Sequence, residues 1–388
     1  MICIFSPAGE LTGGTYRSLR SMLGFPRGKF RLFMPLDVKL SLLNALKQLI
    51  NDPLLYSLVA SAEELNPIGT CKGKWRCYVN YGKKLIPQLK ESKCEVIYVP
   101  HEHPYIPLGF GSSVKWAMLL QVTPVVGSLI TEEGRGFRLF WKNMKLKYET
   151  SPIKILKGYY RLLTYKKLFK IGKVFAVSKS ISYELEKLGI GSNVEVLWPG
   201  VGVDPCQQKN PPNNRDIDVI FFARLLPEKG IYDFLKVVKI LQQQSPRIKA
   251  IAIGMADEQN YQRIVTYSKN QNINVNIVHN LKRDEAMRLL GRAKLMIYPS
   301  KFDAFPLAVL EALSCGTPVI AYNIPAIRLN FETPAVMKVR PGDIMEMAEL
   351  ALITLSNYYE FADEAIKFAS MFTWENVSQT EWSRISSL

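Results

Sequence analysis

Short apolar runs alternate with amphipathic stretches along most of the chain. The alternation is clearest in the second half, where apolar runs at 217–225, 248–254, 275–280 and 294–300 are separated by helical patterns at 230–244, 258–271 and 282–293. Strands that alternate with helices of about 10 to 15 residues form parallel sheets with helices on both faces. The pattern therefore predicts an α/β protein with doubly wound parallel sheets.

The first half repeats this pattern less regularly. We predict strands at 1–7, 29–35, 94–100, 124–131, 173–178 and 194–204, helices from Thr15 and at 38–50 and 179–190, and less decided helical stretches at 54–66 and 78–91. A chain of 388 residues with 48% hydrophobic residues is long enough for two cores. We predict domains at 1–198 and 199–370, and the polar, Pro/Asn-rich stretch 207–216 has the composition of a linker or exposed loop.

The segment Tyr298–Ala321 carries the most informative pattern. Pro306 is suited to a first helical position and Gly316 is suited to a helix end, so a short helix is predicted between them. This helix is apolar on every face except at Glu311, and a buried carboxylate requires a polar partner. Asp303 lies in the loop before the helix, whose N-terminus would attract phosphate. An anionic ligand with hydroxyl groups would fit both features.

A second candidate site follows the first strand of the second half. Arg224 and Lys229 are five positions apart across a turn that contains Pro227 and Gly230, so both cations can point to one place. Fixed cations stabilise the negative charge that develops on a leaving phosphate. The alternative is an ordinary surface turn with two solvated cations.

The segment with Asp303, seven intervening residues, Glu311 and then A-L-S-C-G-T-P-V-I-A resembles the donor-sugar motif of retaining glycosyltransferases of family 4, among the glycosyl transferases group 1. The resemblance implies the GT-B fold, with two Rossmann-like domains facing across a cleft and a final helix, 371–388, crossing back to the first domain. It also implies a nucleotide diphosphate sugar as donor substrate, with no other cofactor and no metal. Arg224 and Lys229 resemble the pair of cations that makes a metal unnecessary in that family.

The same resemblance assigns donor-binding roles to several further positions. Glu311 would bind the ribose hydroxyls and Asp303 the sugar hydroxyls. The remaining donor-side residues would be Gly13 and Gly14 near the diphosphate, Gly254, His279, Asn280 and Leu281 around the base, and the backbone N–H groups of Phe305, Leu307 and Ala308.

Two positions depart from the family pattern. The first carboxylate of the motif is usually Glu, and here it is Asp303. Many relatives also end a first-domain strand with a histidine that faces the reacting sugar, and the positions aligned with it here are Ile130 and Thr131. His101 and His103 follow the strand 94–100 and are the acceptor-side candidates, because ligands bind at the carboxyl ends of such strands. The alternative for them is a solvated loop without function.

Positive charge is concentrated in the first half. Residues 1–197 contain 29 Lys/Arg and 14 Asp/Glu, whereas the remainder contains 21 and 20. Within 142–173 there are ten Lys/Arg and one acid, Glu149, interleaved with aromatic and aliphatic residues. Such a segment can lie on an anionic membrane surface, or it can be an internal helix with solvated lysines. The charge indicates an anionic partner for this half.

The six cysteines, Cys3, Cys71, Cys77, Cys94, Cys206 and Cys315, are scattered without a C-x-x-C pair. Together with three histidines they provide no recognisable zinc site, and we predict a reduced, cytoplasmic setting. The sequence shows no apolar run of about 18 residues and no signal-peptide pattern at its start. We therefore expect a soluble protein or one held peripherally on the cytoplasmic face of the membrane.

The sequence thus predicts a retaining, metal-independent, hexosyltransferase-like enzyme that transfers a sugar to a lipid-linked or other anionic glycan. The alternative is a catalytically silent sugar-nucleotide-binding or scaffolding protein. A nucleic-acid-binding protein is a third hypothesis, but no nucleic-acid module is recognisable and we expect no nucleic-acid partner.

Overall fold

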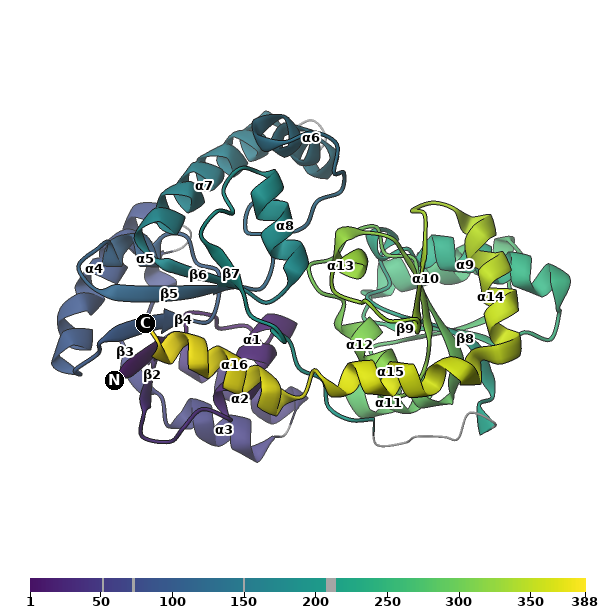
Figure 1. The fold of residues 1–388 in the computed structure, drawn as a ribbon, viewed down its shortest axis with the longest axis horizontal. Helices are drawn as coiled ribbons and strands as arrows, with labels where there is room; N and C mark the ends of the chain where they lie inside the picture. The colour runs from purple at the N-terminus through teal and green to yellow at the C-terminus, as the bar shows by residue number, and fades with distance from the viewer. Residues whose placement is uncertain (51, 72–73, 149–150, 207–213) are drawn as a thin grey trace. The chain divides into compact units, whose positions relative to one another are not determined.

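A computed structural model describes residues 1–388 except 51, 72–73, 149–150 and 207–213 (Figure 1). The chain forms two compact units. Unit 1 contains Met1–Gly202 and Trp374–Leu388, and unit 2 contains Val203–Thr373. Most of the predicted linker lies outside the described residues.

Unit 1 is built on a parallel seven-stranded sheet with strand order β3-β2-β1-β4-β5-β6-β7. Its strands are β1 (Ile2–Phe5), β2 (Phe30–Pro35), β3 (Glu63–Leu65), β4 (Val96–Val99), β5 (Lys115–Leu120), β6 (Lys173–Ala176) and β7 (Val194–Val196). Its helices are α1 (Gly13–Met22), α2 (Leu36–Leu49), α3 (Pro53–Ala60), α4 (Trp75–Glu91), α5 (Ile106–Phe110), α6 (Gly136–Tyr148), α7 (Pro152–Ile171), α8 (Lys179–Lys187) and the returning α16 (Trp374–Ser386), with one 3₁₀ turn, η1 (Gly69–Cys71). The central strands β1 and β4 are fully buried, as strands covered by helices on both faces must be.

Unit 2 is built on a parallel six-stranded sheet with strand order β10-β9-β8-β11-β12-β13. Its strands are β8 (Ile217–Phe222), β9 (Ala250–Gly254), β10 (Val275–His279), β11 (Ala293–Tyr298), β12 (Val319–Tyr322) and β13 (Val336–Val339). Its helices are α9 (Ile231–Gln244), α10 (Glu258–Asn270), α11 (Arg283–Arg292), α12 (Leu307–Ser314), α13 (Pro325–Arg328), α14 (Ile344–Asn357) and α15 (Ala362–Ser370), with 3₁₀ turns η3 (Pro227–Lys229) and η4 (Tyr358–Phe361).

Two predictions for the first half are wrong. The stretch 124–131 is not a strand, and the strand between β4 and β6 is β5, Lys115–Leu120. The apolar residues of 124–131 are buried in an irregular segment because side chains satisfy its backbone: Asn143 Oδ1 accepts from Ile130 N and Thr131 N, at 2.6 and 2.9 Å. Similarly, the predicted helix 54–66 ends early as α3, and its last residues form the edge strand β3.

The cysteines also differ from the prediction. All six are paired in disulfides, Cys3–Cys94, Cys71–Cys77 and Cys206–Cys315. Two of these join residues 91 and 109 positions apart, which sequence spacing cannot reveal. Because disulfides persist mainly in oxidising compartments, the pairing removes the reason for predicting a reduced setting. Among the described helices, none is sufficiently long and apolar to cross a membrane.

Candidate functional site

The predicted donor-side residues of unit 2 gather at the carboxyl ends of its strands. Strand order runs outward from β8 to β9 and β10 on one side, and from β11 to β12 and β13 on the other. The loops after β8 and β11 therefore open in opposite directions, and open α/β sheets bind ligands at such a switch point. Arg224 and Lys229 follow β8, and Asp303 follows β11.

Lys229 and Asp303 are in direct contact. Lys229 Nζ lies 2.6 Å from Asp303 Oδ2, and Tyr298 Oη donates to the same oxygen at 2.6 Å. The backbone N–H of Ala304 donates to Asp303 Oδ1 at 2.8 Å. Asp303 thus accepts from three donors, and burial followed by the Asp303 charge raises the pKa of Tyr298 well above its ordinary value. The structure thus brings together two of the three predicted catalytic residues.

Gly230 lets the turn that carries Lys229 pack closely against the chain just after β11. Its φ is +84°, and a Cβ at this position would lie 2.0 Å from the carbonyl oxygen of Pro299. Only glycine permits both the left-handed backbone and this approach. Arg224, in contrast, is exposed on the same loop, close enough to affect the Tyr298 hydroxyl electrostatically.

Glu311 on α12 has the polar partner that its burial requires. Its side chain is 6% exposed, and Oε1 lies 2.5 Å from Nη1 of Arg283, the first residue of α11. Nη2 of Arg283 is also 4.0 Å from Oδ2 of Asp204. Burial raises the pKa of Glu311, and the charge of Arg283 opposes that shift. The sequence analysis missed Arg283, although a cation at the start of the preceding helix was the available signal.

The N-terminus of α12 has the uncapped backbone N–H groups that the predicted anion site requires. Pro306 is its N-cap and no side chain caps it. The helix begins with Leu307 and Ala308, which are partly exposed, and the buried Phe305 precedes the N-cap Pro306. Their backbone N–H groups have no carbonyl partner within a helix, because the first turn never does.

The four residues predicted around a base lie at the ends of β9 and β10. Gly254 and His279 are paired in the sheet register, and Asn280 N donates to Gly254 O at 3.1 Å. The His279 ring stacks on Tyr261 with centroids 4.0 Å apart, and Leu281 follows in the loop to α11. Asn280 has a positive φ of 56° and bonds the backbone of Ala256 through its side chain. These contacts fix the carboxyl ends of β9 and β10 and the start of the loop that follows β10.

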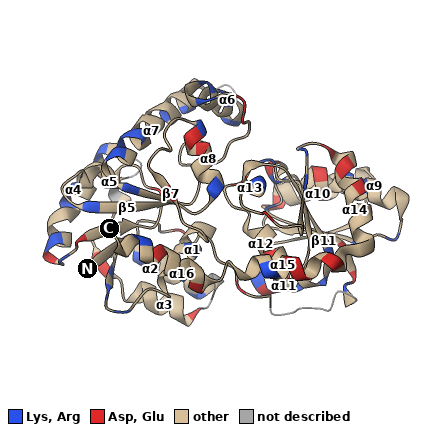
Figure 2. Cartoon of the chain, in the orientation of Figure 1, with Lys and Arg blue, Asp and Glu red and all other residues tan. Residues whose placement is uncertain are grey.

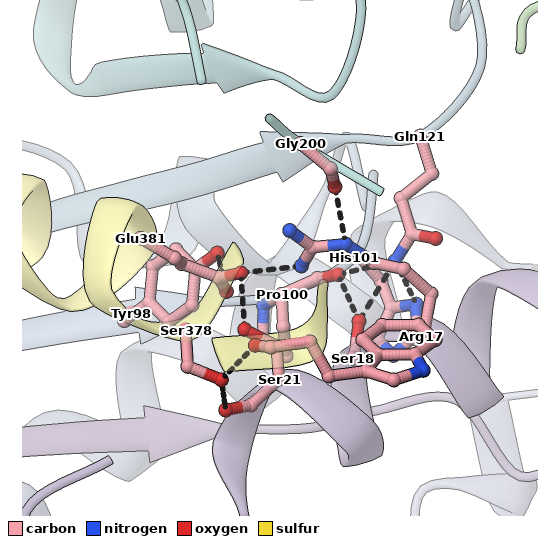
Figure 3. Close-up of polar contacts among 11 residues, drawn as sticks. Arg17, Ser18, Ser21, Tyr98, Pro100, His101, Gln121, Gly200, Ser378 and Glu381 are labelled. Carbon is pink, nitrogen blue, oxygen red and sulfur yellow. Dashed lines mark hydrogen bonds and ion pairs between the residues drawn. The ribbon is translucent and has the colours of Figure 1, made fainter. Parts of the chain in front are cut away.

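In unit 1 a polar network surrounds α1, the helix that begins at Gly13 (Figure 3). Gln121 Nε2 donates to Ser18 Oγ and to Pro100 O, each at 2.8 Å. Its Oε1 lies 2.6 Å from where a Cβ of Gly14 would be, so a larger residue there would displace the Gln121 side chain. Gly13 and Gly14 are the first residues of α1, and Gln121, which follows β5, links Ser18 of the same helix to Pro100, which follows β4.

The same network ties α1 to the returning helix α16. Arg17 Nε donates to Gly200 O at 2.7 Å, and its Nη1 lies 2.5 Å from Oε2 of Glu381. Glu381 also accepts from Ser21 Oγ at 2.8 Å and Tyr98 Oη at 2.6 Å, and it is fully buried. The last 15 residues are therefore part of unit 1 through a buried, fully paired carboxylate.

His101 and His103 follow β4 but are largely enclosed. Burial, together with the nearby Arg17 charge, lowers the pKa of His101 to about 3. Burial and Arg161 lower the pKa of His103 to about 4, and its Nδ1 accepts from Ile106 N at 3.2 Å. Both rings are neutral at pH 7. Between them, Glu102 accepts from Gln121 N at 3.1 Å, and burial raises its pKa.

The corrected strand changes which residue stands at the carboxyl end of the strand between β4 and β6. Because β5 ends at Leu120, the residue at its carboxyl end is Gln121, and Ile130 and Thr131 lie ten residues away from that edge in an irregular segment. Gln121 was not among the predicted site residues. The buried run that precedes it, Trp116–Leu120, was the missed signal.

The fold of the chain is similar to that of a known class of enzymes. Two parallel α/β units of this type form the GT-B fold of glycosyltransferases, and solved structures match the whole chain. UDP-bound HepE of Anabaena gives a TM-score of 0.67 at 16% identity over 100% of both chains. WaaG, a glycosyltransferase involved in lipopolysaccharide biosynthesis, gives 0.65 at 11% identity, also over 100% of both chains.

The family comparison matches unit 2. Residues 204–368 match the family model of glycosyl transferases group 1. A glycogen synthase of Mycobacterium tuberculosis is 26% identical over 152 residues, which cover 38% of this chain and 36% of that protein. O-antigen chain mannosyltransferase B of Escherichia coli is 31% identical over 91 residues, 23% of this chain and 24% of that protein. The chain thus spans about a third or less of the length of these two relatives.

Proposed function

We propose that the protein is a retaining glycosyltransferase of family 4 that moves a sugar, a hexose by resemblance, from a nucleoside diphosphate to an acceptor hydroxyl. The observation that carries the proposal is the contact between Lys229 and Asp303 at the switch point of unit 2, next to the uncapped N-terminus of α12. These residues lie inside the segment that matches glycosyl transferases group 1. The UDP in HepE supports a nucleotide diphosphate as the donor's leaving group.

The proposed reaction breaks the bond between the anomeric carbon and the diphosphate oxygen. Arg224, Lys229 and the N–H groups of Phe305, Leu307 and Ala308 stabilise the negative charge that develops on that oxygen, so that no metal is needed. The acceptor oxygen bonds the anomeric carbon from the same face, and its proton passes to the departing phosphate. Asp303 orients the sugar hydroxyls by accepting hydrogen bonds from them. It must do so while it also contacts Lys229 and Tyr298.

The remaining donor-side assignments follow the same proposal. Glu311 binds the ribose hydroxyls through the oxygen that Arg283 does not hold. Gly254, His279, Asn280 and Leu281 surround the base, and Gly13 and Gly14 approach the diphosphate. Unit 2 is thus the nucleotide-sugar-binding domain and unit 1 the acceptor-binding domain.

We also propose that the acceptor is a lipid-linked or otherwise anionic glycan and that the enzyme is held peripherally on a membrane. The excess of Lys/Arg in residues 1–197 supports an anionic partner for unit 1. His101 and His103 are proposed to shape the acceptor side as neutral rings, since pKa values of about 3 and 4 make them weak bases at pH 7.

Release of nucleotide from a panel of UDP- and GDP-sugars tests the reaction. We expect one donor to be hydrolysed slowly without acceptor and faster with lipid-linked glycans. Lys229→Met should lower the rate by about 10²- to 10³-fold, since it removes one donor to the leaving group. Lys236→Met, on the exposed side of α9, is the matched control. Nucleotide binding in a thermal-shift assay with no turnover of any donor would instead support the catalytically silent alternative.

A further inference from the structure

Helix α7 has two apolar stripes, of which only one is used by the fold. The inner stripe is buried against unit 1 and contains Ile155, Leu162, Tyr165 and Phe169. The outer stripe contains Ile153, Leu156, Tyr160 and Leu163, which are 44% to 68% exposed. Its spacing of three, four and three residues places all four side chains on one side of the helix. Because the inner stripe already anchors α7, the outer stripe has no role in the core.

Helix α6 extends this exposed apolar surface. Phe137 and Trp141, four positions apart on one side of α6, are 57% and 44% exposed. The Phe137 ring lies 5.4 Å from the ring of Tyr159 on α7, and Tyr159 lies 6.4 Å from Tyr160. The two helices therefore present one connected set of exposed side chains. We call it the outer face: Phe137, Trp141, Ile153, Leu156, Tyr160 and Leu163.

Positive charge surrounds the outer face. Within their described ranges, α6 carries four Lys/Arg and α7 six, and neither helix contains Asp or Glu (Figure 2). At 3.6 residues per turn, Lys157 and Arg161 flank the outer stripe on one side, and Lys166 and Lys170 flank it on the other. An apolar stripe between rows of cations on a surface helix is the pattern of helices that lie in a lipid headgroup region.

We propose that the outer face docks on an anionic lipid surface, with its aromatic and aliphatic side chains inserted at the boundary of headgroups and acyl chains. The flanking cations would contact lipid phosphates while their stems follow the apolar boundary. The choice of lipid over a protein partner rests on the charge. Within their described ranges the two helices carry ten cations and no acid, and eight of these cations remain besides Lys142, which pairs with Glu133, and Lys147, which donates to Val126 O. This inference rests on the proposed membrane attachment and adds the surface and the mode of contact.

Apolar insertion and charge attraction differ in their response to salt. Attraction between exposed charges is screened over about 8 Å at physiological ionic strength, whereas apolar burial is not weakened by salt. The outer face therefore predicts two components of binding. One component is lost as salt rises, and the other persists and depends on the exposed apolar side chains.

Co-sedimentation of the full chain with vesicles separates the two components. Vesicles of phosphatidylcholine alone are compared with vesicles that also contain phosphatidylglycerol, at low and high salt, without donor sugar. We expect the parent to bind the anionic vesicles and to retain part of this binding at high salt. The variant Leu156→Ser, Tyr160→Ser, Leu163→Ser should lose at least about tenfold in partitioning, since three exposed anchors are removed.

The matched control is Leu40→Ser, Leu54→Ser, Tyr56→Ser, which removes three exposed apolar residues from α2 and α3 of the same unit. It should bind like the parent. Equal binding of the parent and the outer-face variant would overturn the proposal. Loss of a soluble dimer in the outer-face variant, measured by sedimentation velocity, would overturn it in favour of a second copy of the chain.

Trp141 provides a direct measure of insertion. Lipids brominated along the acyl chain should quench the fluorescence that Trp141→Phe removes, and absence of that quenching would count against insertion. Both measurements are independent of catalysis. Loss of vesicle binding in the outer-face variant with unchanged turnover of a water-soluble acceptor would support membrane docking by the outer face. It would also show that docking is separate from the sugar-transfer reaction.

Discussion

The two units differ in how their candidate sites are assembled. In unit 2 the charged residues form two short pairs. Lys229 and Asp303 come from the segments that follow β8 and β11, and Arg283 and Glu311 come from helices α11 and α12. In unit 1 the equivalent edge is held by a buried network in which Arg17 and Glu381 are 364 positions apart in the sequence. A site whose residues lie close together in the sequence can be recognised from a local motif. A site that joins the first helix of unit 1 to the last helix of the chain cannot.

The largest expected effect tests the network of unit 1. Glu381→Ala leaves Arg17 as a buried charge without its carboxylate, and breaking a buried pair in this way costs about 3–5 kcal/mol of unfolding free energy. Urea denaturation measures it, with Glu375→Ala at the start of α16 as the control. If Glu381→Ala were no less stable than that control, the network would not anchor α16.

Substitution of Glu311 tests whether the ion pairs of unit 2 belong to a nucleotide-binding site. Glu311→Ala should raise the nucleotide dissociation constant by tenfold or more, because hydrogen bonds to a charged group contribute about 1.5–3 kcal/mol. The variant should remain folded. Titration calorimetry with UDP and GDP gives the constant, and unchanged affinity for the preferred nucleotide would remove Glu311 from the donor site.

Arg283 should have a smaller effect of the same kind, since it acts through Glu311. We expect Arg283→Ala to raise the KM for donor several-fold while kcat changes little, because the carboxylate loses its orientation before the chemical step. Arg283→Lys should restore part of the loss. A fall in kcat with KM unchanged would show that Arg283 acts elsewhere in the reaction.

Acidification should affect unit 1 through His101. An unfolded histidine binds its proton near pH 6.5, whereas the pKa of His101 in the folded chain is about 3. The unfolded state therefore binds more protons in this window, and stability falls as pH drops from 6.5 toward 3, by at most about 1.4 kcal/mol per pH unit for this group. His101→Gln should flatten the dependence measured by urea unfolding. An NMR titration that placed the His101 pKa near 6.5 would contradict this expectation.

The smallest effect is expected from metal removal. Transfer should persist in EDTA, because Arg224 and Lys229 are proposed to meet the leaving phosphate. The acidic pair Asp216 and Asp218 is engaged elsewhere: Arg292 Nη2 lies 2.6 Å from Asp216, and Lys294 Nζ lies 2.7 Å from Asp218. Activity abolished by EDTA and restored by manganese would contradict the proposed metal-independent reaction.

The sequence by itself determined the alternation of strands and helices in unit 2 and the short buried helix with Glu311, because each of these follows from local periodicity and from Pro and Gly at helix ends. It also indicated that Glu311 needs a partner. Only the tertiary structure decided that this partner is Arg283, that β5 begins at Lys115, that all six cysteines are paired, and that Gln121 stands at the end of β5. These four features depend on which strands are neighbours in the sheet and on which side chains satisfy buried backbone groups. Such contacts join residues that are far apart in the sequence, so a local sequence pattern cannot specify them.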